Sequence, residues 1–244
     1  VSKEAADMIL LDDNFATIVH AVREGRRIFD NIRKFIKYIL TGNSGEIWTI
    51  FLAPLLGLPI PLIPIQILWI NLISDGLPAL AFASEPAEED ILKRPPRKTD
   101  ESIFSGGIVI HVLWVGLLMG AVCLGTQAWA IHTENPKWAT MVFTVLSISQ
   151  MGHALAIRSD IKSLFTMGIF GNRHLIIAVL ITIGLQLIVV YLPFFQNIFN
   201  TQALTFSELV ICLTLSSLVF LFVELEKWTK RRRYNATNLK GYPV

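Results

Sequence analysis

The chain has 244 residues, of which 53% are hydrophobic and 16% charged, and its mean hydropathy is +0.55. Because an ordinary soluble domain carries about 25% charged residues, this composition excludes that class and favours a membrane protein. The net charge is only +2 at pH 7, so no nucleic-acid partner is expected. Both cysteines, Cys123 and Cys212, lie in apolar stretches, and a disulfide framework is therefore not expected.

The N-terminal residues predict a soluble remnant followed by one long helix. The chain opens without a Met, so we expect a piece of a longer protein, and residues 1–13 include an apolar stretch (5–11) that suits the last strand of a preceding domain. Asn14 is a good helix cap, and the apolar spacing continues from it to Leu56. Such a helix would be about 60 Å long, twice the hydrocarbon thickness of a bilayer. We therefore predict a cytoplasmic stalk over residues 14–34.

Six segments are long and apolar enough to cross a bilayer, which takes about 20 residues each. They are residues 35–56, 62–82, 108–131, 139–157, 175–195 and 206–225. The predicted fold is an all-α membrane protein, a six-transmembrane-helix bundle over residues 35–226 with a long cytoplasmic stalk on the first helix.

The gaps between these segments alternate between rich and poor in basic residues. Basic residues precede the first segment, fill the second and fourth gaps and follow the last segment, whereas residues 57–61 and 196–205 contain none and the third gap has only Lys137. By the positive-inside rule, both termini are expected in the cytoplasm, and residues 227–244 form a basic cytoplasmic tail.

Two acidic residues lie inside apolar segments, Glu46 in the first and Asp75 in the second. An acid at the bilayer centre costs about 2.5–3.5 kcal/mol on insertion scales and usually marks an ion or ligand pathway. Asn43, Asn71 and Ser74 stand near them at helical spacing. Carboxylate, amide and hydroxyl oxygens without Cys or His are the ligands of a hard cation. The sequence therefore predicts a cation site within the membrane.

The second segment carries helix breakers beside its acid. Gly76 and Pro78 follow Asp75, and an interrupted helix is tolerated in a membrane where its free carbonyls line a cavity or bind an ion. Pro78 has no N–H to donate to the carbonyl of Ser74, so this oxygen is expected to be free beside the carboxylate.

Three stretches together resemble the membrane half of a P-type ATPase of the calcium-pump branch, from its fifth to its tenth transmembrane helix. They are Asn43 with Glu46 three positions later, the run from Gln66 to Ala79 and the basic, proline-rich run from Lys93 to Arg97. The resemblance covers essentially the whole chain. It implies that the transported ion, calcium, is moved out of the cytoplasm. Buried carboxylates emptied of metal are expected to take up protons, which is compatible with proton countertransport, and whether protons return in exchange stays open.

The resemblance also implies a set of site residues. Those expected to bind the transported cation are Asn43, Glu46, Asn71, Ser74 and Asp75, with Gln150 as a weaker sixth ligand. Gln150 stands where the muscle-type pump has a Glu that completes one of two calcium sites, whereas Glu46 is an acid that one-ion types usually lack. The number of ions per cycle therefore stays open.

The same resemblance implies that the phosphorylated Asp, the nucleotide-binding and actuator domains and the first four helices belong to a preceding half of the same polypeptide. No catalytic residue is expected in this chain, and Mg²⁺ and ATP would act only through those domains. The expected partners are that N-terminal half and the lipid bilayer, and the short loops suit the plasma membrane of a bacterium.

Other readings of the residues stay open. A pump for manganese, sodium or protons would use similar ligands, a passive channel or secondary transporter would need a complete pathway in six helices, and a non-catalytic membrane anchor would keep a vestigial site. His111 and His153 have no second His or Cys at metal-binding spacing, and each is interpreted as a helix-packing residue. Gln127 and Gln186 are interpreted as interhelical hydrogen bonds.

Overall fold

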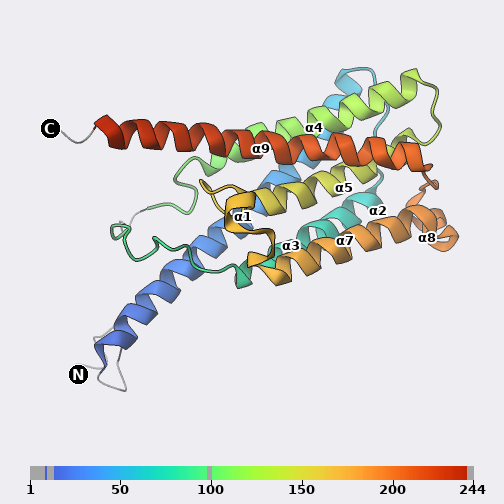
Figure 1. Ribbon diagram of the computed structural model, residues 1–244. Helices are drawn as coiled ribbons and strands as arrows, with labels where there is room; N and C mark the ends of the chain where they lie inside the picture. Colours follow the sequence, from blue (N-terminus) through green and yellow to red (C-terminus); the bar gives the residue numbers. More distant parts are fainter. Residues whose placement is uncertain (1–8, 10–13, 98–100, 241–244) are drawn as a thin grey trace.

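The computed structural model describes residue 9, residues 14–97 and residues 101–240, the last of these (233–240) by backbone alone. Throughout these residues the regular structure is helical, and the long helices lie side by side in a bundle (Figure 1). The predicted all-α class is therefore confirmed. The strand expected at residues 5–11 and most of the soluble remnant fall outside the described residues, as does the end of the basic tail.

The helices follow the predicted segments closely. They are α1 (Phe15–Leu55), α2 (Pro64–Trp69), a π-helical segment (Ile70–Asp75), α3 (Gly76–Ala81), α4 (Ile108–His132), α5 (Trp138–Ala156), α6 (Leu164–Met167), α7 (Arg173–Tyr191), α8 (Pro193–Phe199) and α9 (Phe206–Lys240). Short 3₁₀ turns occupy Phe82–Ser84 and Ile169–Gly171.

Within the described residues, five helical stretches are long and apolar enough to cross a membrane. These are Pro64–Ser84, Ile108–His132, Trp138–Ala156, Arg173–Tyr191 and Phe206–Arg232. The first predicted span, residues 35–56, is not among them, although it forms the C-terminal half of α1. Its polar stretch from Thr41 to Glu46, preceded by Lys37, lowers the hydropathy of every window there.

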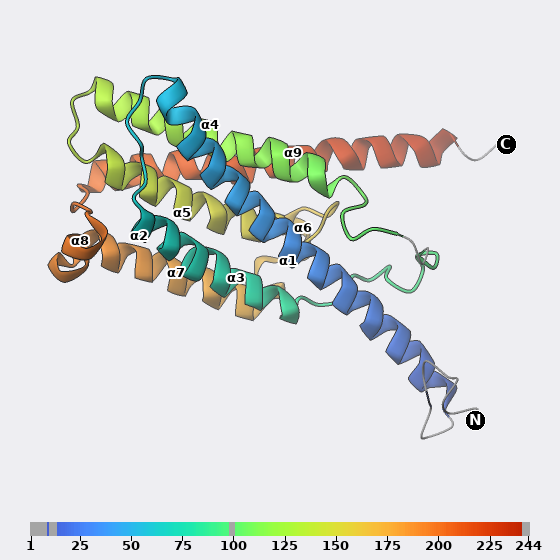
Figure 2. The same ribbon diagram turned by 180° about the vertical axis from the view of Figure 1, so that it is seen from behind.

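The expected long first helix is present as the 41-residue helix α1. Asn14 caps it, because its side-chain oxygen accepts a hydrogen bond of 3.0 Å from the backbone N–H of Ala16. The first turns of α1 extend beyond the other helices (Figure 2). The beginning of α1 and the end of α9 lie at the same end of the bundle, and α8 lies at the opposite end (Figure 1).

Helices α1 and α4 pack closely because glycines remove the side chains between them. A Cβ atom added at Gly116 of α4 would lie 2.2 Å from Oγ of Ser44, and one added at Gly120 would lie 2.8 Å from Cβ of Trp48. Small residues of this kind let two helix backbones approach in a membrane, where lipid offers no hydrophobic driving force for packing. The half of α1 that carries Glu46 is thereby held against α4.

The second predicted span is interrupted differently from the expectation. The chain is not broken at Asp75; it passes from α2 into α3 through the π-helical segment and stays helical throughout. A π turn closes its hydrogen bond one residue further along the chain than an α turn does, and such turns are frequent at functional sites. The helix of the fifth predicted span also ends before residue 195. Helix α7 stops at Tyr191, because Leu192 leaves the helix and Pro193 begins α8.

The loop after α3 is tied to α1 by the basic residues that precede the first span. The guanidinium of Arg26 donates to the carbonyl oxygens of Ile91 (2.7 Å) and Arg94 (2.8 Å), and Arg94 pairs with Asp30 of α1 at 2.9 Å. Arg33 donates to the carbonyl of Ser105 at 2.5 Å. Movement of α1 would therefore be transmitted to this loop.

A buried ion pair joins the loops that follow α3 and α5. The side chains of Arg158 and Glu85 are 2% and 0% exposed, with Nε and Oε1 3.0 Å apart. Asn172, which caps α7, donates to the same carboxylate at 2.7 Å, and Arg158 also donates to the carbonyls of Gly168 and Ile169. Each charge thus has an oppositely charged partner and further hydrogen bonds, which lowers the cost of its burial.

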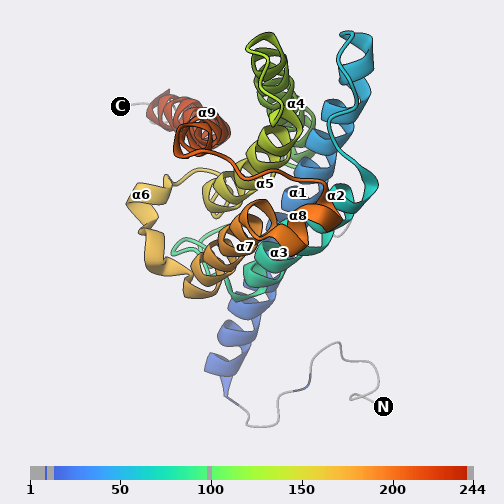
Figure 3. The same ribbon diagram turned by 90° about the vertical axis from the view of Figure 1, so that its right-hand side faces the viewer.

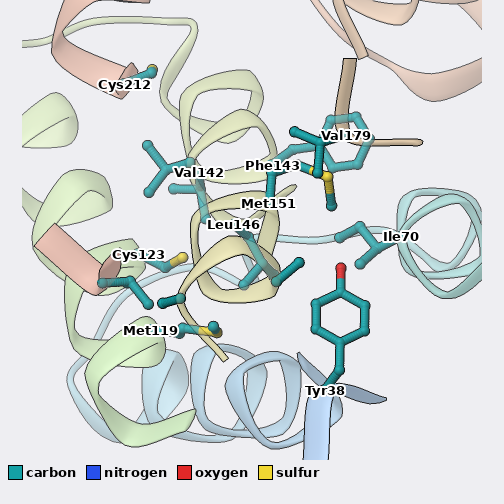
Figure 4. Packing of buried hydrophobic residues seen from close by; sticks show 14 of the residues in the cluster. Tyr38, Ile70, Met119, Cys123, Val142, Phe143, Leu146, Met151, Val179 and Cys212 are labelled. Carbon is teal, nitrogen blue, oxygen red and sulfur yellow. The ribbon is translucent and has the colours of Figure 1, made fainter. Parts of the chain in front are cut away.

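Helix α5 runs through the middle of the bundle and carries much of the core. Seen along the bundle, α5 is surrounded by α4, α9, α7 and α1 (Figure 3). Its side chains Val142, Phe143, Leu146 and Met151 are buried at the centre of the apolar cluster (Figure 4). Polar residues on α5 consequently lie inside the protein, where they must find partners or ligands.

Candidate cation site

Glu46 of α1 lies inside the bundle with only 4% of its surface exposed. Its two carboxylate oxygens accept hydrogen bonds from two side-chain amides, Nδ2 of Asn71 at 3.0 Å and Nε2 of Gln150 at 3.4 Å. Three elements therefore converge on this acid: α1, the π-helical segment and α5. The predicted association of Glu46 with Asn71 is present, and Gln150 joins it from a helix far away in sequence.

Asp75, the last residue of the π-helical segment, is 2% exposed and packs against α1 at Gly42. A Cβ atom added at Gly42 would lie 2.8 Å from Oδ1 of Asp75 and 3.0 Å from Nε2 of Gln150. Among the described residues neither oxygen of this carboxylate has a hydrogen-bond partner. Only a glycine at position 42 leaves room for the acid and the amide to meet there.

Ser74 is fully buried, and both its side chain and its carbonyl are engaged. Its hydroxyl lies 2.7 Å from the hydroxyl of Ser147 on α5, and its carbonyl accepts a hydrogen bond of 2.7 Å from the hydroxyl of Tyr38 on α1. The expectation that this carbonyl would be free is therefore wrong: Pro78 cannot donate to it, and Tyr38 donates instead. A carbonyl oxygen has two lone pairs, so one acceptor position is used.

The two other predicted ligands sit at the margin of the site. Asn71 is exposed in this chain, although its amide contacts Glu46 and also donates to the carbonyl of Ile67 at 3.0 Å. Asn43 is half-buried and lies one helical turn before Glu46 on α1. Hydrogen bonds thus link Glu46 to Asn71 and Gln150. Asn43 is related to them only by its place on α1, one turn before Glu46.

The sequence interpretation missed Tyr38, Gly42 and Ser147. A signal for the first two was present, because Tyr38, Gly42 and Glu46 recur every four residues and share one face of α1. Ser147 likewise precedes Gln150 by one turn of α5. Serine and tyrosine are common in membrane helices, so this periodicity is recognisable only once the acid on the same face is taken as a ligand.

The chemistry of these side chains is that of a site for a hard cation. Two carboxylates are buried close together, and the ion pairs and hydrogen bonds of the described residues give neither of them a basic partner. Among those residues no group of three or more His, Cys, Asp or Glu side chains is placed to hold a metal, and the polar groups beside the two acids are amides and hydroxyls. Such donors suit calcium, magnesium or manganese rather than zinc or copper.

A helical bundle with apolar spans around two unpaired acids defines a membrane protein with a candidate cation site. Comparison with known families identifies the class more closely. The model for the C-terminus of cation-transporting ATPases matches residues 59–229, which is most of the chain. The chain therefore belongs to this family of cation-transporting ATPases.

Curated relatives extend the similarity over almost the full chain. It is 43% identical over 221 residues to a calcium-transporting ATPase of Bacillus subtilis, which covers 89% of the chain. It is 37% identical over 235 residues to the human calcium-transporting ATPase type 2C member 1 (96% of the chain). It is 34% identical over 274 residues to the endoplasmic reticulum calcium ATPase srcA of Aspergillus fumigatus (99% of the chain).

The chain spans only about a quarter of the length of these relatives: 25% of the Bacillus protein, 26% of the human one and 28% of the Aspergillus one. It corresponds to their C-terminal membrane part.

Proposed function

We propose that this chain is the cation-binding membrane half of an ATP-driven calcium pump that exports calcium from the cytoplasm. The observation that carries the proposal is the pair of buried acids, Glu46 and Asp75, on facing elements and without a basic partner. The curated relatives, each named as a calcium-transporting ATPase, support calcium as the ion. A divalent cation between the acids would offset the cost of burying both charges.

The proposed ligands are Asn43, Glu46, Asn71, Ser74, Asp75 and Gln150. Together they offer about six to eight oxygens, depending on how many oxygens each carboxylate uses, and calcium takes 6–8. In the structure Asn71 and Gln150 turn their N–H groups toward Glu46. Rotation of each amide by half a turn would present its carbonyl oxygen to a cation, since an amide is a donor on one side and an acceptor on the other.

Further oxygens would come from the preceding half of the pump. Asn71 is exposed on the surface of this chain, so its side of the site is open to another element. The first four helices of the parent protein are the proposed cover. The number of ions bound per cycle depends on those helices as well as on Gln150, which carries no charge.

The proposed energy input is phosphoryl transfer from ATP, with Mg²⁺, to an aspartate in the preceding domains. Residues 14–34 of α1 would act as a cytoplasmic stalk and residues 35–56 as a sixth span, so that one rigid helix links those domains to Glu46. Two observations support this arrangement: α1 is a single helix, and its first turns extend beyond the bundle (Figure 2). The ties from Arg26 and Arg94 would pass its movement to the loop after α3.

The proposed topology places both termini in the cytoplasm, in the plasma membrane of a bacterium. The distribution of basic residues between the spans supports it. So does the position of the beginning of α1 and the end of α9 at one end of the bundle (Figure 1).

Calcium-dependent phosphorylation of the full-length pump by ATP tests the proposal. We expect Glu46→Gln and Asp75→Asn to raise the calcium concentration for half-maximal phosphorylation by about 100-fold or more, since each removes a charged ligand worth about 3 kcal/mol. Glu208→Gln is the matched control. Glu208 lies in the first turn of α9, where its carboxylate pairs with Lys137 at 3.0 Å. A glutamine at this position can still cap the helix.

Normal calcium dependence in both acid variants would contradict the proposed site. The ion is tested separately, by ATP-driven uptake of calcium, manganese and sodium into vesicles. We expect calcium uptake to be fastest, whereas faster manganese uptake would reassign the cargo, and uptake without ATP would indicate a channel.

A further inference from the structure

A second buried polar cluster lies on the cytoplasmic side of the candidate cation site. The rings of His111 on α4 and His153 on α5 meet with their Nε2 atoms 3.1 Å apart, and Nδ1 of His111 lies 2.9 Å from a carboxylate oxygen of Glu226 on α9. The two histidines are 3% and 0% exposed. The interpretation of each as an isolated packing residue was therefore incomplete, because they bind each other across two helices.

The hydrogen bonds of this cluster fix which ring nitrogen donates. Glu226 accepts from Nε1–H of Trp114 at 3.2 Å, and its carboxylate also takes the Nδ1–H of His111. In neutral His111 the other nitrogen, Nε2, must then accept, so Nε2–H of His153 donates to it. Both rings consequently have one allowed orientation, and His153 is held between α4 and α5.

His153 in turn holds the ring of Tyr38. The two rings stack with centroids 5.9 Å apart and planes 17° from parallel, and Phe82 packs on Tyr38 with centroids 5.7 Å apart. Tyr38 is fully buried, and its hydroxyl points toward the π-helical segment, beside Ile70 (Figure 4). The phenol therefore has one position, from which it donates to the carbonyl of Ser74 at 2.7 Å.

The carbonyl of Ser74 belongs to the peptide unit that joins two proposed ligands, Ser74 and Asp75. Its position fixes where both side chains begin. Metal–ligand distances tolerate only about 0.2 Å of change, and the supporting residues of a site must hold it to within about 0.5 Å. Because the hydrogen bond from Tyr38 to the Ser74 carbonyl is direct, the position of the phenol ring bears on the position of this peptide unit.

We infer that His153 is a positioning residue for the cation site: anchored by His111 and Glu226, it stacks on Tyr38 and so holds the Ser74–Asp75 peptide in place for calcium. This inference rests on the proposed function of that site. His153, His111 and Glu226 are not among the proposed ligands. They set the affinity of the site for calcium through one aromatic contact and one hydrogen bond.

Two substitutions of His153 separate its stacking on Tyr38 from its hydrogen bond to His111. His153→Phe keeps a ring against Tyr38 but loses the bond to His111, whereas His153→Asn keeps an amide that can bond to His111 but loses the ring. In the full-length pump we measure the calcium concentration for half-maximal phosphorylation by ATP, and the maximal phosphorylation level. His174→Asn, at an exposed position near the start of α7, is the control.

We expect His153→Asn to raise the half-maximal calcium concentration about tenfold without lowering the maximal level. We expect His153→Phe, whose ring still stacks on Tyr38 but is no longer anchored by His111, to raise that concentration by only about threefold, a partial rescue that a purely interhelical role of His153 would not produce. Tyr38→Phe should raise the half-maximal calcium concentration as much as His153→Asn does. The double variant Tyr38→Phe/His153→Asn should show no larger rise than either single variant, because both substitutions act through the hydrogen bond from Tyr38 to the Ser74 carbonyl.

Three results would overturn the inference: an unchanged calcium dependence in His153→Asn, equal losses in the Phe and Asn variants, or additive losses in the double variant. Should His153→Asn fail to accumulate, the comparison of Tyr38→Phe with His153→Phe decides in the same way. The failure of the proposed function looks different, because Glu46→Gln and Asp75→Asn would then keep the parent's calcium dependence, or the unsubstituted pump would show no calcium-dependent phosphorylation.

Discussion

Substitution of Gly42 by alanine tests the packing of the cation site with a single methyl group. The added Cβ would lie 2.8 Å from Oδ1 and 3.1 Å from Oδ2 of Asp75, and 3.0 Å from Nε2 of Gln150. Carbon atoms in contact normally stay about 3.5 Å or more from their neighbours, so the carboxylate must retreat by about half an ångström. That exceeds the tolerance of a metal site, about 0.2 Å.

Overpacking of a core position costs about 1–3 kcal/mol, and where this cost falls on the displaced carboxylate it corresponds to a loss of calcium affinity of about 5- to 150-fold. Helix propensity acts in the opposite direction, because alanine in a helix is about 1 kcal/mol more favourable than glycine. A loss of affinity with unimpaired folding is therefore specific to the clash. Equilibrium calcium binding to the full-length pump measures the affinity, and thermal unfolding in detergent measures the folding.

Gly125→Ala is the matched control, since nothing lies within 4 Å of a Cβ at that position of α4. It should bind calcium as the parent does. The reasoning is refuted if Gly42→Ala also binds calcium with the parent's affinity, because Asp75 would then not be confined against α1 when the ion is bound.

Two further predictions concern stability, measured as thermal unfolding of the chain in detergent. Arg158→Met should destabilise by about 3–5 kcal/mol, because it leaves the carboxylate of Glu85 buried without a charged partner, whereas Lys162→Met, which breaks an exposed pair, should cost under about 1 kcal/mol; equal effects would contradict the role of burial. Gly116→Ala should destabilise by about 1–3 kcal/mol by placing a methyl group 2.2 Å from Oγ of Ser44, and a stabilised variant would show that α1 and α4 do not pack so closely.

The acids of the site were predictable from the sequence because each is costly in an apolar span. Glu46 and Asp75 needed no knowledge of their neighbours, and both are buried in the bundle. Gln150 was expected only through the family resemblance, since a single amide in a span is compatible with an ordinary interhelical hydrogen bond. Its contact with Glu46 depends on how α5 crosses α1, which no periodicity along one helix reveals.

Contacts between helices account for most of what the sequence did not show. His111 and His153 have no metal-binding spacing, yet the packing of α4 on α5 brings their rings together. The π turn at Ile70–Asp75 was expected as a break, because Gly76 and Pro78 signal weak α-helix without saying how the backbone adapts. By contrast, Gln186 accepts an interhelical hydrogen bond from Trp69 as expected, whereas Gln127 donates to the carbonyl of Pro59 in the loop after α1 and not to another helix.

The first predicted span is not recognised by hydropathy because it contains polar residues that are proposed ligands. Residues 35–56 were predicted as a span for their apolar residues, but the polar stretch around Glu46 keeps them from being recognised by hydropathy. The proposed ligands themselves thus obscure the segment that carries them.

The most direct test of the central claim is a structure of the full-length protein with calcium bound. We predict an ion between α1 and the π-helical segment, with oxygens of Glu46 and Asp75 about 2.3–2.6 Å away and the amides of Asn71 and Gln150 turned toward it. An ion bound elsewhere in the bundle, with these two acids making no contact to it, would contradict the account.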